Sequence, residues 1–501
     1  MSLSSPARTR PPAGTRTPPP GLVLLLTSVA FFIVSLDSLV VLTALPAIHA
    51  SVGGSVATLE WTVNGYALPF AAGIITAAAL GDRLGHRAVY VAGLGLFTVA
   101  SAACALAPSA GLLIAARAAQ GAGAAAITPL ALTILTRAFP AGRRGTIIGI
   151  WGGIGGLAIA GGPLVGGAVV QGLDWHWIFW LNVPVGALAA AGSLRFLPGG
   201  RGAAARLDLP AVPLIAGGAA VLAWALIRVG DDGWGDGRAI GAFVLAAALL
   251  AGLALRERVA AEPMLPLRLL RNRAFAAAGV TTFCTAGAIF SAAFLTVQFF
   301  QLGLGYSPLA AGLRLLPWTA APMVVAPLAG ALADRTGTRP MMVAGLLLQA
   351  AGLAWVSAVA GSAGAGYGQL VVPLVIAGVG VSMVLPTMQA AALSAVAPAD
   401  LGLASGVAAT MQRFGAAFGI ALVTAVFAAH GGLGTAASMT AGYRPALVVS
   451  AAISLAGALA ALASAAKAGP ATSAGPATSA GPARAGGAER PAGADWPGAA
   501  G

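Results

Sequence analysis

The chain has few of the residue types that soluble enzymes depend on. Only 8% of its 501 residues are charged, against about 25% in a typical soluble domain. Two cysteines, Cys104 and Cys284, lie inside apolar runs, so no disulfide framework is predicted. The four histidines fall in separate predicted loops, at His49, His86, His176 and His430. Histidines so far apart in the sequence predict no metal cluster.

Lysine is almost absent, since Lys467 is the only one in the chain. A P-loop holds phosphates with a Gly-Lys-Ser/Thr sequence, and Lys467 precedes Ala468 in a low-complexity segment. The same scarcity excludes a retinal Schiff base inside a span. No nucleophile elbow or metalloprotease motif is present. We therefore expect no enzyme activity and no cofactor, and any uphill transport would draw on an ion gradient without an ATPase partner.

Long apolar runs dominate the sequence, in which 58% of residues are hydrophobic. A helix needs about 20 apolar residues to cross a bilayer. Scanning for such runs predicts fourteen spans, of which the eighth is the shortest: 22–47, 59–80, 88–107, 110–136, 146–171, 177–197, 209–229, 239–255, 274–302, 309–333, 340–360, 368–396, 403–427 and 443–466. The polar segments 1–21 and 467–501 are predicted to be disordered tails.

The net charge of +13 follows the loops and predicts no nucleic-acid partner. Arginines concentrate in alternate loops, while the opposite loops hold only Arg228, Arg238 and Arg444, with Arg314 near a span end. This positive-inside pattern places both termini in the cytoplasm. The bias toward Ala, Gly and Arg over Lys suggests a high-GC bacterial gene. The expected location is therefore the bacterial inner, or cytoplasmic, membrane.

Two segments of the sequence repeat in order. The charged stretch 78–88, which contains Gly-Asp-Arg-Leu-Gly-His-Arg, returns as 330–340 with Ala-Asp-Arg-Thr-Gly-Thr-Arg. A second series of small residues also recurs in order: Gly121, Gly123, Pro129, Gly145, Gly149 and Gly162 correspond to Gly378, Gly380, Pro386, Gly402, Gly406 and Gly419. Paired repeats in a membrane protein indicate two related bundles that form a secondary transporter.

The repeats predict an all-α polytopic membrane protein with two six-helix bundles and two extra central spans. The first bundle covers 22–198 and the second covers 274–466. The segment 199–273 contains cytoplasmic linkers and the two inserted spans. A small-molecule substrate, protons and the lipid bilayer are the expected partners, and the chain is expected to act as a monomer.

Several motifs resemble the major facilitator superfamily, in its fourteen-span drug:proton antiporter branch. The resemblance covers roughly residues 22–466. It rests on the span 1 segment 36–46, the loop segment 81–87, the span 4 segment 117–123, the span 5 segment 162–167 and the segment 175–184. Ala78 departs from the loop motif, which usually begins with Gly. The resemblance implies the major facilitator fold and drug efflux by alternating access.

Asp37 and Arg117 are the predicted proton-coupling residues. Asp37 lies in the outer half of span 1, where an ionised carboxylate is costly unless it is paired, hydrated or protonated. Arg117 lies about 10 Å deep in span 4, at 1.5 Å per residue, so both groups can share one level. Whether their helices face each other is left open by the sequence. The resemblance implies that Arg117 belongs to the proton-coupling apparatus.

Two further sets of residues are predicted to control conformation. The gating loops are expected to use Asp82, Arg83, Gly85 and Arg87 in the first repeat and Asp334, Arg335, Gly337 and Arg339 in the second. The resemblance implies that these loops latch one conformation of the two bundles. It also implies that the span 5 antiporter motif, Gly162, Pro163, Gly166 and Gly167, resists leak and marks exporters. Glycines of this spacing let helices approach closely.

Substrate contacts are predicted from polar and aromatic side chains within the spans: Asn64, Tyr66, Gln120, Trp151, Phe294, Gln298, Gln301, Gln389 and Arg413. Phe294, Gln298 and Gln301 share one helical face by their spacing. For Arg413, a role in lining the cavity and a role in bonding backbone carbonyls both remain open. Glu60 can attract cationic drugs or simply begin a helix beside Trp61.

These observations favour a secondary transporter that exports amphipathic or aromatic drugs or antibiotics in exchange for protons. One alternative is a proton-coupled exporter of another small metabolite, such as an amino acid, a sugar or a siderophore. A second alternative, from a different class, is a non-transporting membrane receptor or scaffold. That reading gives no reason for two gating loops or for an acid buried in a span.

Overall fold

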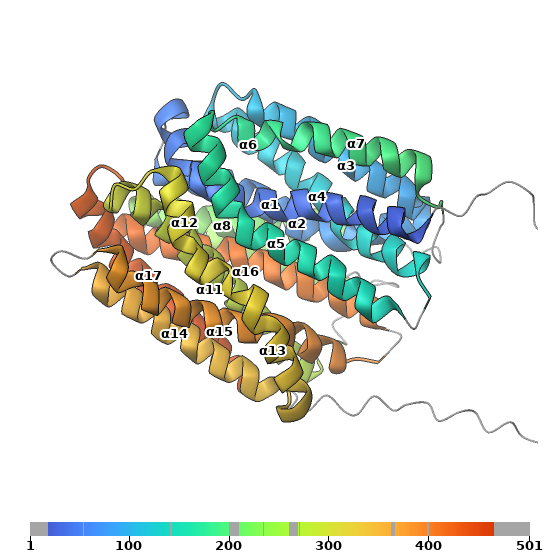
Figure 1. Cartoon of the computed structure of the whole chain (residues 1–501). Coiled ribbons are helices and arrows are strands. Elements are labelled where there is room, and N and C mark those ends of the chain that lie inside the picture. The colour runs from blue at the N-terminus through green and yellow to red at the C-terminus, as the bar shows by residue number, and fades with distance from the viewer. Residues whose placement is uncertain are drawn as a thin grey trace, which may run out of the picture. The chain divides into compact units, whose positions relative to one another are not determined.

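The computed structural model describes residues 19–53, 55–140, 143–199, 210–233, 235–259, 269, 271–361, 366–397 and 400–464. Within these ranges the secondary structure is helical, as expected (Figure 1). Apart from residues 19–21, the predicted tails 1–21 and 467–501 lie outside the described residues. Apolar runs form helices here because a helix satisfies its backbone hydrogen bonds internally, which hydrocarbon requires.

Seven helices form the first group, coloured blue to green in Figure 1: α1 (Pro20–Val52), α2 (Val56–Leu84), α3 (His86–Ala105), α4 (Ala110–Ala138), α5 (Arg144–Gly172), α6 (Trp177–Trp180) and α7 (Asn182–Phe196). Short α6 and α7 follow each other and together make one apolar span, Trp177–Phe196. The first group therefore accounts for the six spans predicted between 22 and 197.

The second group runs from yellow to red in Figure 1 and ends near residue 462: α11 (Arg273–Gln298), π-helix η2 (Phe299–Gly303), α12 (Pro308–Thr319), α13 (Ala321–Thr336), α14 (Thr338–Ala360), α15 (Tyr367–Ser394), α16 (Leu401–His430) and α17 (Ala436–Leu462). The apolar span Pro308–Thr336 is divided at Ala320 into α12 and α13. Pro317, Pro322 and Pro327 surround this break, and proline removes backbone hydrogen bonds from a helix.

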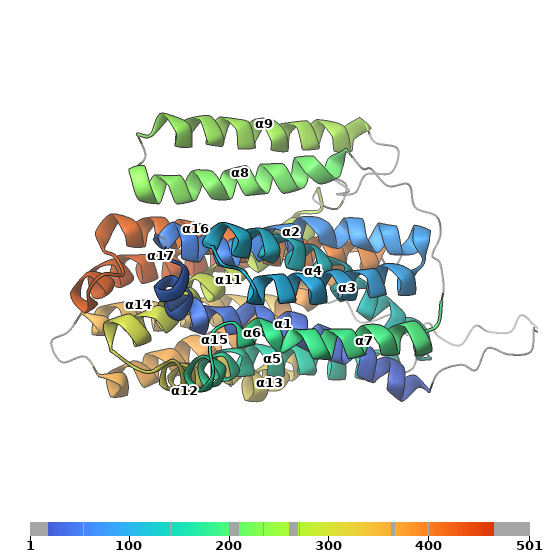
Figure 2. The ribbon, with the colours of Figure 1, turned by 90° about the horizontal axis from the view of Figure 1, so that it is seen from above.

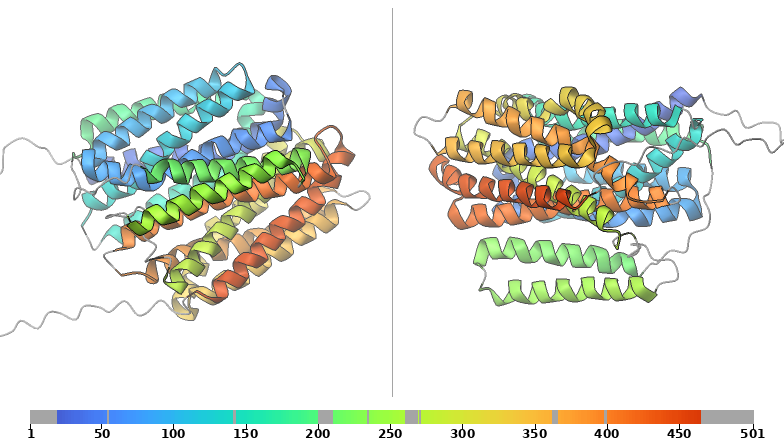
Figure 3. Two further views of the ribbon diagram at one scale, coloured as in Figure 1. Left: turned by 180° about the vertical axis from the view of Figure 1, so that it is seen from behind. Right: turned by 90° about the horizontal axis from the view of Figure 1, so that it is seen from below.

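Helices α8 (Ala211–Asp232) and α9 (Gly237–Val259) form the inserted pair. Figure 2 shows them beside α2 and α16, with α9 outermost, and Figure 3 shows the same arrangement from behind and below. Thirteen helices in the described ranges are long and apolar enough to cross a membrane, and α8 adds a shorter apolar stretch, Pro213–Leu226. Helix α8 runs for 22 residues and α9 for 23, so both inserted spans that the sequence predicts are helical.

The ends of α8 and α9 are joined by an ion pair between Arg228 Nε and Asp236 Oδ2 at 2.9 Å. This hydrogen bond from Arg228 is the main cause that lowers the pKa of Asp236 below its ordinary value. Because the pKa of Asp236 is lowered, the ion pair stabilises the folded protein at pH values above the ordinary carboxyl pKa. This stabilisation is lost as the pH falls through the lowered pKa.

The two repeated loops fold into the same turn. Gly85 ends α2 with a φ of 108°, and Gly337 ends α13 with a φ of 91°. Side chains oppose this backbone region, which glycine enters readily. The recurrence of glycine in 78–88 and 330–340 therefore has a backbone cause. We call this side of the molecule the motif end, and the side with the 52–56 and 105–110 connections the opposite end.

Close helix packing inside the first bundle depends on glycine. A Cβ added to Gly93 on α3 would lie 2.6 Å from Ala126 Cβ and 3.0 Å from Gly123 O on α4. By contrast, a Cβ added to Gly95 on the same helix would meet no atom within 4 Å. Position 93 of α3 therefore has no room for a side chain.

Gly93→Leu should lower the thermal unfolding temperature of the purified protein, because overpacking costs about 1–3 kcal/mol. Gly95→Leu is the matched control: it makes the same change in the same helix where space is open, and we expect no loss. Unfolding would be followed by heating both variants in detergent. Equal unfolding temperatures for the two variants would contradict the packing argument.

Candidate functional site

A buried ion pair lies inside the first bundle, between α1 and α4. Arg117 Nη1 lies 2.5 Å from Asp37 Oδ2, and each residue is 1% exposed. An isolated charge inside a membrane is costly, but opposite charges in contact offset much of that cost. Removing one partner of a buried pair typically destabilises a protein by about 3–5 kcal/mol. The two predicted coupling residues therefore face each other directly.

Two amides complete the surroundings of the Asp37 carboxylate. Gln120 Nε2 and Asn182 Nδ2 each donate to Asp37 Oδ1 at 3.0 Å. Gln120 follows Arg117 by three residues in α4, so both side chains lie on one helical face. Asn182 is the first residue of α7. Hydrogen-bond donors from α4 and α7 thus hold the Asp37 carboxylate of α1 in place.

Arg117 is itself held by several groups. Its Nε donates to Thr62 O at 3.2 Å, and its Nη1 donates to Gln120 Oε1 at 2.6 Å. The guanidinium carbon lies 4.2 Å from the centroid of the Tyr66 ring, a distance that favours cation–π attraction. Gly121 explains how α4 comes so close to α2, because an added Cβ would press on the Tyr66 backbone.

Asn182 is part of this site but was not among the predicted site residues. Asn182 lies within the segment 175–184 that carried part of the family resemblance, and that was the available signal. Ser101 on α3 was also missed, although its hydroxyl accepts a hydrogen bond from Gln120 Nε2 at 2.8 Å. A serine inside an apolar helix has no distinguishing pattern, because it can bond its own backbone.

Both predicted gating loops lie at the motif end, with different local contacts. In the first, Asp82 Oδ1 pairs with His86 Nε2 at 2.8 Å, and Arg137 Nη1 lies 3.1 Å from His86 Nδ1. Arg87 Nη1 donates to Leu197 O at 3.1 Å, which ties the loop to the end of α7. Arg83 is exposed.

In the second loop, Thr338 occupies the place of His86. Asp334 and Arg335 are exposed, and Arg339 is partly exposed. The two loops therefore share their backbone turn but not their side-chain contacts.

The span 5 motif packs between the two bundles. An added Cβ at Gly162 would lie 2.8 Å from Leu39 Cβ on α1, within the first bundle. Gly167 faces the second bundle instead, where its Cβ would lie 2.8 Å from Leu309 Cα on α12. Gly312 on α12 packs equally closely against α5, since an added Cβ there would lie 2.8 Å from Pro163 C. The motif therefore allows close backbone contact on two sides of α5.

Three predicted substrate contacts belong to the ion-pair network or lie near it. Gln120 and Tyr66 both contact Arg117, and the Tyr66 hydroxyl donates to Val34 O at 3.2 Å. Asn64 is buried, and its Nδ2 donates to Glu60 Oε1 at 3.4 Å. These side chains already have partners within the protein.

Trp151 and Arg413 stack on aromatic rings of the first bundle. The Trp151 ring on α5 lies 3.8 Å from the Phe31 ring, nearly parallel to it. The Arg413 guanidinium, from α16 of the second bundle, lies 4.2 Å from the centroid of Phe70. Arg413 is partly exposed and bonds a side chain rather than the backbone carbonyls that the sequence left open.

The remaining predicted substrate contacts, on α11, η2 and α15, differ in how far they are buried and in their partners. Phe294 and Gln298 are 0% and 1% exposed, and Gln298 Nε2 donates to Phe294 O in its own helix. A substrate would reach these two only after a rearrangement. Gln301, in η2, donates to Thr43 O on α1 at 3.0 Å and so links the bundles. Gln389 on α15 is partly exposed.

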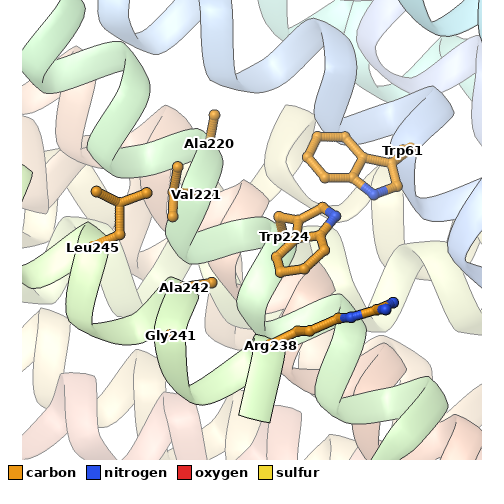
Figure 4. Close-up of a pocket in the computed structure, with 8 residues that line it drawn as sticks. All are labelled: Trp61, Ala220, Val221, Trp224, Arg238, Gly241, Ala242 and Leu245. Atoms are coloured by element: carbon orange, nitrogen blue, oxygen red, sulfur yellow. The ribbon is translucent and has the colours of Figure 1, made fainter. Parts of the chain in front are cut away.

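A separate cavity of about 490 Å³ lies between α2 and the inserted helices. Its lining is mostly apolar, and Figure 4 shows Trp224 beside Trp61, with Leu245 across from them and Arg238 at one edge. The lining residues are Trp61, Ala220, Val221, Trp224, Arg238, Gly241, Ala242 and Leu245. None of them belongs to the Asp37 network, so this cavity is distinct from the candidate coupling site.

Comparisons with known proteins agree with this architecture. The profile of the Major Facilitator Superfamily matches residues 27–324 and 318–492. The chain is 35% identical over 439 residues to the tetracenomycin C resistance and export protein of Streptomyces glaucescens, covering 86% of this chain and 81% of that protein. It is also 35% identical over 459 residues to the cephamycin export protein of Amycolatopsis lactamdurans, covering 86% and 90%.

Solved structures show the same fold at low sequence identity. An auto-inhibited peptide transporter of the POT family superposes with a TM-score of 0.66 at 15% identity, covering 88% of this chain and 96% of that one. A bacterial homologue of the human lysosomal transporter Spinster gives 0.63 at 16%, covering 90% and 98%. The apolar helices and these relatives describe a multi-pass membrane protein. The chain belongs to the major facilitator superfamily.

Proposed function

We propose that this chain exports amphipathic or aromatic drugs, including antibiotics, in exchange for protons. It acts as a monomer in the bacterial cytoplasmic membrane, with both termini and the motif end in the cytoplasm. The observation that carries the proposal is the Asp37–Arg117 pair, a titratable acid held inside the bundle by donors from other helices. The names of the related export proteins support the drug substrate and the direction of transport.

Proton coupling follows from the way that Asp37 is held. An ionised carboxylate accepts all of its hydrogen bonds, whereas a protonated one carries a donor on one oxygen. Protonation would therefore remove the counter-charge of Arg117 and disturb the bonds from α4 and α7. Because these donors come from separate helices, the protonation state of Asp37 is linked to how those helices pack. A ligand that prefers one packing can shift the protonation equilibrium in turn.

The contacts between the bundles support alternating access. Gln301 bonds to Thr43 O at 3.0 Å, and Leu309 N donates to Gln171 Oε1 at 3.3 Å, both across the bundle boundary toward the opposite end. Exposed Asp334 and Arg335 lie at the motif end. We assign this arrangement to a state that is closed to the outside. In the other state, the charged loops would act as latches at the cytoplasmic end.

Asp37→Asn should abolish drug-triggered proton release by the purified protein and stop concentrative export, because asparagine fills nearly the same space without titrating. Passive exchange of drug is expected to survive. Release would be measured with a pH indicator after drug addition, and export in vesicles with an imposed pH gradient. Asp236→Asn is the matched control, since it also neutralises an arginine-paired acid but in a loop. Undiminished proton release from Asp37→Asn would place the coupling acid elsewhere.

Asp82→Asn and Asp334→Asn should each slow transport several-fold at unchanged membrane levels, because both remove a charge that the latches use. The effects need not be equal, since only Asp82 is paired with a histidine in this state. Asp174→Asn is the control, because it removes a histidine-paired acid at the opposite end. Flux per molecule in vesicles is the measurement, and full rates in both loop variants would reject the latch role.

A further inference from the structure

Arg413 places a second cation beside the helix that carries Asp37. Its Nη1 donates to Ser38 Oγ at 3.4 Å, and its guanidinium lies over the Phe70 ring. Arg413 comes from α16 of the second bundle, while Ser38 and Phe70 come from α1 and α2 of the first. Within the described part of the chain, Arg413 forms no ion pair. Its contacts there are with a hydroxyl and an aromatic ring rather than with an acid in direct contact.

The second repeat differs from the first at this position. The alignment that pairs Gly162 with Gly419 also pairs Gly156 with Arg413. Glycine on α5 carries no charge, so this cation exists in one bundle only. A packing role shared by both repeats does not explain it.

Among the charged and titratable groups around Asp37 in the described residues, Arg117 from α4 contacts it directly. Tyr66 from α2 contacts Arg117, Cys104 from α3 contacts Gln120, and Arg413 from α16 contacts Ser38. Glu60, also on α2, is buried and accepts a hydrogen bond from Asn64. Helix α7 contributes the uncharged Asn182, and α5 packs on α1 through glycines. Of these two arginines, Arg117 belongs to the same bundle as Asp37 and Arg413 to the other.

The separation between Arg413 and Asp37 is set by the backbone of α1. Asp37 and Ser38 are consecutive, and their Cα atoms lie about 3.8 Å apart. With the guanidinium at the Ser38 hydroxyl, the charge of Arg413 lies beside the residue that follows Asp37 in α1. The buried Asp37 carboxylate interacts with nearby charges more strongly than a carboxylate in water does.

We infer that Arg413 is a positioning residue that makes the protonation of Asp37 depend on the relative position of the two bundles. When α16 lies against α1 and α2, as here, the Arg413 charge favours the ionised carboxylate. When the bundles rock apart at this level, Arg413 leaves and Asp37 takes up a proton. This inference rests on the proposed function, in which Asp37 is the coupling acid.

The direction of this effect fits exchange of protons for drug. In this structure the bundles contact each other toward the end proposed to face outward. A cation near Asp37 in that state promotes proton release to the cytoplasm. Arg413 would thus make the proton affinity of Asp37 depend on which side is open, which is what an ion-driven transporter requires.

The test is a pH titration of the full chain in lipid nanodiscs by infrared spectroscopy, which needs no transported drug. The protonated carboxyl band of Asp37 is identified by its loss in Asp37→Asn. Arg413→Gln should shift the midpoint of that band upward by about one pH unit, because a cation that favoured the carboxylate is gone. Arg413→Met is a second neutral variant of similar length, in case the first fails to fold. Arg413→Lys should stay near the parent midpoint.

Two matched controls separate charge from packing. Thr410→Val removes the neighbouring contact between α16 and α2, where Thr410 Oγ1 donates to Ala71 O at 3.5 Å, without changing charge. Arg314→Gln removes a cation from α12 that lies over the Tyr306 ring instead. We expect neither variant to move the Asp37 midpoint.

The outcomes distinguish this inference from the proposed function. An unshifted midpoint in the neutral Arg413 variants would overturn the role of Arg413 and leave Asp37 as the coupling acid. A midpoint that moves equally in Thr410→Val would overturn it too, because packing would then be the cause. If Asp37→Asn removes no band at any pH, Asp37 does not titrate, and the proposed coupling fails together with the inference.

Discussion

A carboxylate and a guanidinium buried together within the helices of a membrane protein constrain everything around them. The charges of Asp37 and Arg117 offset each other's cost, because each residue is only 1% exposed and the two side chains are in contact. Their helices must therefore approach closely, and Gly121 allows α4 to do so against α2. The amides of Gln120 and Asn182 then satisfy the remaining oxygen of the acid. A change in the protonation of Asp37 would consequently alter contacts among α1, α2, α4 and α7.

Glycine supplies the second condition for this mechanism. Bundles that rock against each other need surfaces on which backbones meet without interlocking side chains. Gly167 and Gly312 provide such a surface between α5 and α12, while Gly162 serves α5 and α1 inside one bundle. The same motif thus brings α5 close to both α1 and α12. The inserted pair α8 and α9 lies outside this boundary, against α2 and α16.

Much of the architecture could be predicted from the sequence. Span positions follow from apolar runs, because hydrocarbon selects helices of a set length. The two turns in the predicted gating loops follow from the recurring glycines, which readily adopt the backbone angles found at Gly85 and Gly337. The candidate coupling residues were also visible, since an acid and an arginine stand out in apolar helices. Breaks such as that at Ala320 were not predicted, because they depend on how neighbouring helices pack.

The sequence by itself determined which groups are costly in the membrane, and therefore that Asp37 and Arg117 need partners. Only the tertiary structure decided who those partners are. Asn182 and Ser101 carry no pattern that marks them, since their importance arises from helices that are distant in sequence and adjacent in space. Phe294 and Gln298 share a helical face as predicted, but packing buries that face. Arg413 gained its place beside Ser38 in the same way, because contacts between bundles are set by three-dimensional packing rather than by spacing along one helix.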